Sequence, residues 1–165
     1  MSKIQEFLKS QEKSVMSIVE GKTIIDYLNN NAEESSDYPA LNTPINNEYT
    51  GWDSISWSEY QETVHNLASG LIDIGIKVED NAFIVANNVK EHFISDLGIM
   101  HAGAVPSTIY KQLKSGQIEY ISNLLEAKVA FVGDAELFTE VNKAKDNCPD
   151  TVSYTHLTLP TIYSV

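Results

Sequence analysis

Residues 82–133 read AFIVANNVKEHFISDLGIMHAGAVPSTIYKQLKSGQIEYISNLLEAKVAFVG, and this stretch decides the fold. It holds three short apolar runs: Ala82–Ala86, Ala104–Tyr110 and Val129–Val132. The first is continuously apolar, as in strands that are covered on both faces. The two segments between the runs, which begin at Asn88 and Ser115, carry apolar residues at helical spacing, and Ser115 is expected to cap the second helix. Strand, helix, strand, helix, strand with short connections predicts a parallel βαβαβ sheet. We therefore expect an α/β fold in which helices flank a partial parallel sheet.

The first 22 residues form a separate pattern, which we define as the N-terminal arm (1–22). Its apolar residues recur at helical spacing and alternate with Lys and Glu: Ile4, Phe7, Leu8, Val15, Ile18 and Val19, with Gln11 on the same stripe. This periodicity predicts an amphipathic helix that ends near Gly21. The helix could dock on its own domain or on a second subunit, and we favour packing on its own domain.

Capping patterns predict two further helices before the sheet. Thr23 with Asp26 three residues later resembles a capping box and favours a short helix over residues 24–31. Ser56 with Glu59 is the usual form of that box, and it opens a longer helix. Gly75 is expected to end this helix in a left-handed conformation.

Two weaker signals complete the expected elements. Residues 40–42 and 48–50 could pair as a short hairpin around a turn that contains Pro44. After the last strand of the sheet, Asp134 is expected to cap a helix that ends near Pro149.

Short segments of the chain resemble the AMP-forming acyl-CoA synthetases in order and spacing. They are Ser56–Tyr60, Leu67–Leu71, Gly75, Glu79–Asn81, Ala102–Pro106, Thr108–Tyr110, Gln117–Ile121 and Ala127–Val132. The resemblance runs from about Thr23 to about Val141, and the segment from Pro106 to Tyr110 looks most like the long-chain fatty acid–CoA ligase branch. It implies that residues 23–151 are the truncated N-terminal part of an AMP-dependent synthetase/ligase domain.

The same resemblance implies what the intact parent would do. It would join a fatty acid to CoA through an acyl-adenylate, using ATP, Mg²⁺ and CoA. The Ser/Thr/Gly-rich phosphate loop, the later ATP-binding motifs and the C-terminal lid of this family would all lie downstream of this chain. We therefore expect the chain alone to be inactive, to bind no cofactor, and to contain no catalytic, cofactor-binding or metal-binding residue of its own.

The sequence patterns lead to the same expectation when they are considered apart from the family resemblance. No glycine follows the first strand before Gly98, so a dinucleotide or Walker loop is absent. Asn87 and Asn88 follow that strand, where α/β sheets bind ligands, but capping of the next helix is the favoured role. Paired acidic residues are expected in solvated loops, namely Glu33 with Glu34 and Glu79 with Asp80.

Histidine and cysteine patterns predict neither a metal site nor a nucleophile. His92 and His101 are out of phase on one predicted helix, His65 lies on another, and His156 falls near the C-terminus. Cys148 has no basic neighbour in sequence that would lower its thiol pKa.

The composition excludes some partners. Eleven Lys and Arg residues against 23 Asp and Glu give a formal net charge of −12, which repels nucleic acid and anionic membrane surfaces. No apolar stretch is long enough to span a membrane. A single cysteine and an N-terminus unlike a signal peptide favour a cytoplasmic location. The sequence leaves the oligomeric state and the acyl-chain specificity open.

Two alternatives to a long-chain ligase stay open at this point. Another adenylate-forming branch, acting on amino or aryl acids, would share this N-terminal part because the acyl pocket lies downstream. A self-contained acidic α/β binding or regulatory module, such as a phospho-receiver, would need an acidic cluster at the strand ends. The strands are followed by Asn87, Lys111 and Asp134, which is one acid and not a cluster.

The C-terminal residues 152–165 differ from the rest of the chain. They hold no acidic or basic residue other than His156, and no glycine, and they do not resemble the family or show a clear helix or strand period. Val152 to Thr161 match one reading frame of the adapter used in transposon-based DNA library preparation. A sample barcode would encode residues 162–164, and the adapter would then give Val165 and a stop. We therefore expect a non-native tail after Thr151, the alternative being a natural uncharged strand.

Overall fold

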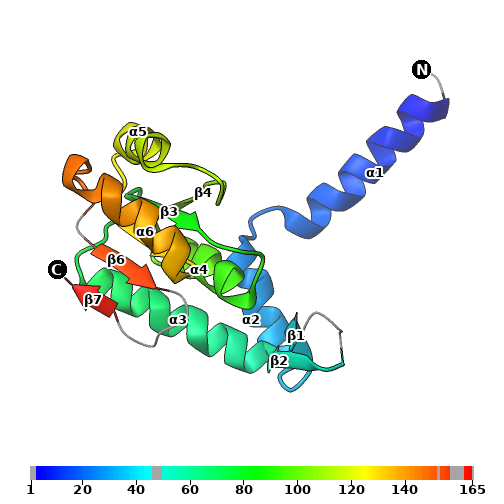
Figure 1. Cartoon of the computed structure of the whole chain (residues 1–165). Helices are drawn as coiled ribbons and strands as arrows, with labels where there is room; N and C mark the ends of the chain where they lie inside the picture. Colours follow the sequence, from blue (N-terminus) through cyan, green and yellow to red (C-terminus); the bar gives the residue numbers. More distant parts are fainter. Residues whose placement is uncertain (1–2, 46–49, 152, 157–161, 165) are drawn as a thin grey trace.

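The computed structural model describes residues 3–45, 50–151, 153–156 and 162–164 (Figure 1). Its helices are α1 (Lys3–Val19), α2 (Ile24–Glu34), α3 (Trp57–Asp73), α4 (Lys90–His101), α5 (Ser115–Leu125) and α6 (Ala135–Ala144), followed by a 3₁₀ turn, η1 (Lys145–Asn147). Its strands are β1 (Pro39–Pro44), β2 (Trp52–Ser56), β3 (Asn81–Val85), β4 (Val105–Thr108), β5 (Val129–Val132), β6 (Ser153–His156) and β7 (Ile162–Ser164).

The main sheet has the strand order β4-β3-β5-β6-β7. Strand β3 lies parallel to β4 and to β5, which confirms the predicted α/β fold with a parallel βαβαβ sheet. Strand β6 continues the sheet parallel to β5, and β7 turns back antiparallel to β6. The sequence shows no clear strand period after Thr151, yet the backbone of residues 153–156 pairs with β5 and that of residues 162–164 pairs with β6.

Alternate residues of the central strands enter two different cores. Phe83 and Val85 pack with residues of α5 and α6, whereas Ala82 and Ile84 pack with residues of α3 and α4. Figure 1 shows these two helix pairs on opposite faces of the sheet. A strand with both faces covered has no polar side to alternate with the apolar one, which is why its sequence is continuously apolar.

A two-stranded hairpin, β1 with β2, packs beside the helices of the N-terminal half. Its strands are antiparallel, with Asn42 opposite Ser54, and Leu41 and Ile55 contact a third core around Leu28 and Val64. The hairpin is confirmed, but its second strand is misplaced in the prediction. The predicted strand at 48–50 lies mostly outside the described residues, and the pairing strand begins at Trp52.

The helix ends follow the capping predictions in part. Thr23 with Asp26 and Ser56 with Glu59 both form complete capping boxes, and Gly75 ends α3 with a φ of 94°. Two predictions about helix starts are wrong. The residue before α4 is Val89, which makes no side-chain capping bond, so neither Asn87 nor Asn88 is the cap. Ser115 is the first residue of α5, and the cap position belongs to Lys114.

Helix α2 is longer than the sequence predicts. It continues to Glu34, so Glu33 and Glu34 lie in its last turn and not in a loop, although both are exposed. Glu79 and Asp80 do lie in the turn before β3, where the Asp80 carboxylate accepts a hydrogen bond from the backbone N–H of Lys77 at 2.7 Å. Exposure to solvent accounts for the two glutamates of α2, and the turn before β3 accounts for Glu79 and Asp80.

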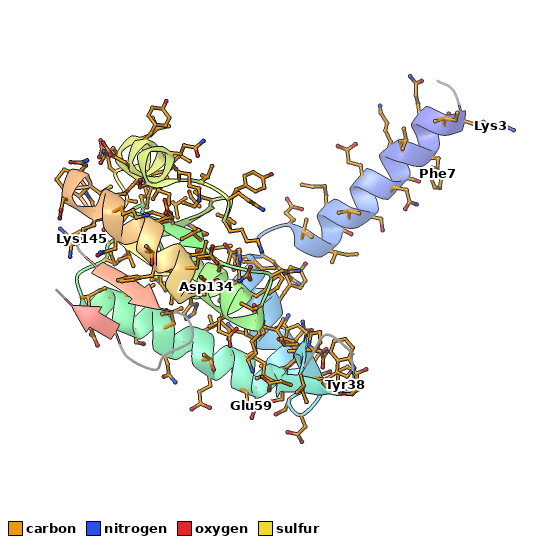
Figure 2. All side chains as sticks on the ribbon, viewed as in Figure 1. Lys3, Phe7, Tyr38, Glu59, Asp134 and Lys145 are labelled. Carbon is orange, nitrogen blue, oxygen red and sulfur yellow. The ribbon has the colours of Figure 1, made fainter. Side chains whose placement is uncertain are left out.

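Helix α1 extends away from the rest of the molecule, and every one of its residues is exposed (Figures 1 and 2). The expectation that it packs on its own domain is therefore wrong. It is joined to α2 through Gly21, and the Tyr27 hydroxyl donates a hydrogen bond to the carbonyl of Ile18 at 3.0 Å. No helix among the described residues is both long and apolar enough to cross a membrane.

Candidate functional site

The carboxyl edge of the parallel strands is the place where an α/β sheet of this kind binds ligands. The side-chain amide of Asn87, just after β3, both donates and accepts a hydrogen bond there. Its amide nitrogen donates to the Asp134 carboxylate at 3.0 Å, and its amide oxygen accepts from the Lys111 ammonium at 2.7 Å. These three residues follow β3, β5 and β4 in turn, so this chain of bonds ties the ends of all three strands together.

Two further pairs of polar side chains lie at this edge. The Nε2 atom of His92 lies 3.1 Å from the Thr108 hydroxyl, and the Lys90 ammonium forms an ion pair with Asp53 of the hairpin. A cavity of about 310 Å³ lies beside them, between β1 and the start of α4, and Leu41, Val89 and Lys90 are among its lining residues. The arrangement stabilises the edge but leaves few polar groups that point at a ligand.

The turn after β5 does not form a phosphate cradle. A Cβ atom at Gly133 would lie 2.8 Å from the Cα of Ala86, so the glycine is needed for close approach of two backbones. Asp134 caps helix α6, because its carboxylate accepts a hydrogen bond from the backbone N–H of Leu137 at 2.8 Å. The residues present at this edge therefore do not fit an ATP–Mg²⁺ group, and we derive no chemical step through one.

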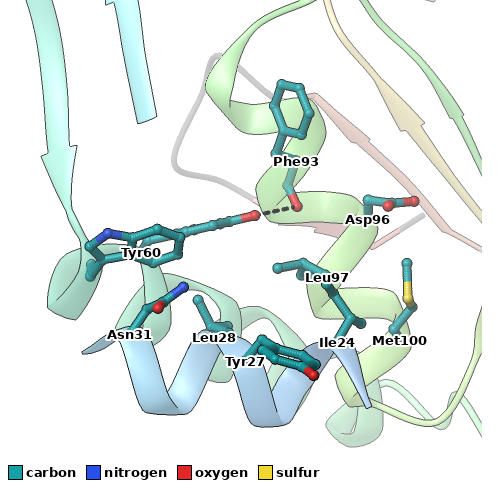
Figure 3. Close-up of a pocket in the computed structure, with 10 residues that line it drawn as sticks. Ile24, Tyr27, Leu28, Asn31, Tyr60, Phe93, Asp96, Leu97 and Met100 are labelled. Carbon is teal, nitrogen blue, oxygen red and sulfur yellow. Dashed lines mark hydrogen bonds between the residues drawn. The ribbon is translucent and has the colours of Figure 1, made fainter. Parts of the chain in front are cut away.

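A second, more apolar pocket of about 320 Å³ lies between α2, α4 and the start of α3 (Figure 3). Its lining residues are Ile24, Tyr27, Leu28, Asn31, Trp57, Tyr60, Phe93, Asp96, Leu97 and Met100. The Tyr60 hydroxyl donates to the carbonyl of Phe93 at 3.2 Å, and burial together with the Asp96 charge raises the pKa of Tyr60 to about 12. Burial also raises the pKa of Asp96, an effect opposed by the nearby His92.

This pocket can accept an apolar group, but it offers no acid–base pair. Tyr60 is held by its hydrogen bond to a helix backbone, and Asp96 has no second carboxylate among the lining residues. Sequence reasoning missed the pocket because its residues come from three helices at irregular spacing. Each of them is also a normal core or surface residue when it is considered by itself.

The structure brings together two histidines that the sequence separates. The rings of His65 on α3 and His101 on α4 are stacked, with their centroids 4.5 Å apart. The Nε2 atom of His65 is buried and has no hydrogen-bond partner among the described residues. Burial, and then the charge of His65, lower the pKa of His101. Sequence reasoning missed this pair because the contact depends on how α3 and α4 pack.

The remaining candidates stay apart from one another. The Cys148 thiol is free and buried, and burial raises its pKa, which makes it a poor nucleophile. Across the described part of the chain, no group of three or more His, Cys, Asp or Glu side chains is arranged to hold a metal ion. His156 lies on β6.

Comparisons with known proteins give the family. The model of the AMP-binding enzyme family matches residues 28–163. The long-chain-fatty-acid–CoA ligase heimdall of Drosophila melanogaster is 28% identical over 141 residues, which cover 84% of this chain and 21% of that protein. The long-chain-fatty-acid–CoA ligase ACSBG2 of Xenopus laevis is 24% identical over 127 residues, 77% of this chain and 17% of that protein.

Solved structures show the same fold. The anthranilate CoA ligase AuaEII, in complex with anthranoyl-AMP, superposes with a TM-score of 0.72 at 20% identity, covering 80% of this chain and 24% of that one. A fatty acyl CoA synthetase of Mycobacterium tuberculosis gives a TM-score of 0.67 at 18% identity, and the match covers 81% of this chain and 26% of that one. This chain thus spans about a quarter or less of the length of these relatives. Because the family model matches most of its length, the chain belongs to the AMP-binding enzyme family.

Proposed function

We propose that residues 23–151 are the N-terminal part of an AMP-forming long-chain fatty acid–CoA ligase. The support is that the family match coincides with relatives named as long-chain-fatty-acid–CoA ligases in an insect and an amphibian. The intact protein would convert a fatty acid, ATP and CoA into acyl-CoA, AMP and diphosphate through an acyl-adenylate, with Mg²⁺ bound to the nucleotide. We also propose a cytoplasmic location, which the free buried thiol of Cys148 supports.

In this proposal the described residues act as a scaffold. The polar groups at the carboxyl edge are bonded to one another, as in the chain from Asp134 through Asn87 to Lys111. Their role is to hold the ends of β3, β4 and β5 in a fixed arrangement beneath whatever binds above them. Groups that are already paired contribute little to binding a nucleotide, because each would first have to break an existing bond.

The direct test is exchange of labelled pyrophosphate into ATP, which reports adenylate formation without CoA. The purified chain is expected to give no exchange with fatty acids of any length. A full-length ligase such as the Drosophila relative serves as the positive control in the same assay. Acyl-CoA formation by this chain alone would contradict the scaffold proposal.

A chimera tests the same proposal from the other direction. Residues 23–151 would replace the matching segment of the Drosophila ligase, with the downstream part left intact. A scaffold that supplies no catalytic group is expected to support acyl-CoA formation with an unchanged preference for chain length. A soluble, folded chimera without any activity would contradict the assignment to this family branch. Sequencing the genomic locus beyond Thr151 should show a Ser/Thr/Gly-rich phosphate loop in the same reading frame.

A further inference from the structure

Helix α1 has an apolar face that no other described residue covers. Side chains on this face are 38–70% exposed: Ile4, Phe7, Leu8, Val15, Ile18 and Val19. The family match begins at residue 28, so α1 lies outside the matched domain and is not one of its core helices. Gly21 separates it from α2, and the Tyr27 hydroxyl of α2 donates a hydrogen bond to the carbonyl of Ile18 in its last turn. The face is therefore presented to solvent as a regular helical surface (Figure 2).

The spacing of this face is that of a helix that pairs with another helix. Ile4, Leu8, Gln11, Val15 and Ile18 follow one another at alternating steps of four and three residues. This is the a/d pattern of a coiled coil, in which a single polar residue commonly fixes the register of the two chains. Gln11 is that residue, and it lies midway between Ile4 and Ile18.

We propose that this face binds the same face of a second copy of the chain, as an antiparallel helix pair centred on Gln11. The amide of Gln11 both donates and accepts, so two copies can satisfy each other. The apolar interior of a membrane offers the amide no partner, and burying it there unpaired is unfavourable. Antiparallel pairing about Gln11 also places Ile4 of each copy against Ile18 of the other.

Charge selects the antiparallel direction. The chain carries a net charge of −12, whereas α1 has one more lysine than glutamate, so the negative charge belongs to the body beyond α1. A parallel pair would bring two negatively charged bodies together at one end. An antiparallel pair separates their attachment points by the length of the 17-residue helix, roughly 25 Å. That separation exceeds the screening length of about 8 Å at physiological salt.

The size of the face indicates a reversible dimer. Each of its exposed side chains offers roughly 100 Å² of apolar surface, so two copies bury on the order of 1,000 Å². Stable interfaces between proteins bury about 1,200–2,000 Å². We therefore expect association that depends on protein concentration, and not a permanent dimer.

Sedimentation velocity of the full chain over a wide concentration range tests the proposal. The wild-type chain should shift from monomer to dimer as its concentration rises. Leu8→Glu places a charge in the middle of the face and should weaken association by about tenfold or more. Ser10→Glu adds the same charge to the same helix at a position outside the a/d stripe, and it should leave association largely unchanged. This comparison holds even if the body also aggregates, because only the difference between the two variants is read.

Disulfide trapping tests the direction of pairing. Chains with Leu8→Cys mixed with chains with Val15→Cys should cross-link to each other in an antiparallel pair, whereas Leu8→Cys alone should not. Cys148 is 4% exposed and does not compete for oxidation. Three results would overturn the proposal: a wild-type monomer at every concentration, equal masses for the Leu8→Glu and Ser10→Glu variants, or efficient cross-linking of Leu8→Cys to itself. A monomer whose α1 binds lipid vesicles would identify a membrane surface as the occupant instead.

Discussion

Gly98 determines how closely α3 and α4 approach at the residue scale. A Cβ atom at this position would lie 2.5 Å from Cδ2 and 2.8 Å from Cγ of Leu67. No real contact is that short, so any side chain here would push Leu67 or the whole of α3 outward. This explains why a helix that is otherwise regular contains a glycine, a residue that costs roughly 1 kcal/mol relative to alanine in a helix.

We therefore expect Gly98→Ala to be less stable than Gly116→Ala, a matched change in helix α5 that meets nothing within 4 Å. Gly98 lies inside α4 and Gly116 in the first turn of α5, so alanine gains at least as much helix propensity at position 98 as at position 116. A lower free energy of unfolding for Gly98→Ala therefore reports the clash. Overpacking of this kind costs about 1–3 kcal/mol. Chemical denaturation of the two variants measures it, and equal stabilities would show that Leu67 moves aside freely.

The stacked histidines predict a pH dependence of stability. Burial and the charge of His65 lower the pKa of His101, so the unfolded chain binds a proton more readily than the folded chain. The stabilisation is complete above the unfolded pKa of about 6.5 and is lost as the pH falls toward the folded value. We expect the free energy of unfolding to fall between about pH 7.5 and pH 5.

His101→Gln should reduce this slope, which urea denaturation at a series of pH values measures. The raised pKa of Asp96 acts in the opposite direction, so the comparison with wild type is needed to isolate the histidine. Asp26 and Glu59 do not interfere, because hydrogen bonds lower their pKa values out of this range. An identical slope in the variant would show that the pair does not control stability.

At the scale of elements, the start of a helix can be predicted from the sequence when the residues that cap it are close neighbours along the chain. Ser56 accepts a hydrogen bond from the Glu59 N–H at 3.3 Å, and the Glu59 carboxylate accepts one from the Ser56 N–H at 2.8 Å. Both partners lie within four residues, so the pattern is visible in the sequence. The start of α4 is not visible in this way. The side chain of Asn87 forms hydrogen bonds with Asp134 and Lys111, which are far along the chain, and Val89 occupies the cap position without a side-chain hydrogen bond.

Ser56→Ala should destabilise the protein by about 1 kcal/mol, because it leaves a helix N–H without its acceptor. Ser69→Ala is the control in the same helix, where the hydroxyl only donates to the His65 carbonyl and alanine favours the helix. Thermal unfolding of both variants should show a lower midpoint for the first and an unchanged or raised one for the second. The reverse order would mean that the capping box contributes little here.

At the scale of the whole molecule, the sequence predicts the layers better than it predicts the site. Continuous apolar runs such as Val129–Val132 indicate a covered strand, and parallel pairing of β3 with β4 and β5 follows from the helices between them. Contacts between distant elements cannot be predicted in the same way, as the His65–His101 stack and the apolar pocket show. The orientation of α1 is the third case, because periodicity identifies an apolar face without identifying its partner.

The C-terminal tail carries the last prediction at this scale. Thr151 is integrated into the fold, since its hydroxyl donates to the carbonyl of Ala127 at 2.8 Å and lies 3.0 Å from the Ser122 hydroxyl. Beyond it, β6 pairs with the outer edge of β5, and the family match runs on to residue 163, although residues 152–165 show no resemblance to the family motifs in the sequence. That pairing does not require a native strand, because an open strand edge accepts many uncharged segments rich in Thr, Tyr and Val.

We predict that the coding DNA for Val152 to Thr161 carries the codons of the library adapter, and that native DNA departs from this chain after Thr151. Amplifying the locus from an independent genomic sample, without transposon adapters, and sequencing across this point is the measurement. A continuous reading frame that goes on into a longer protein is the expected result. Different synonymous codons, or the same tail in the independent copy, would identify 152–165 as a natural strand, and β6 would then be a genuine member of the sheet.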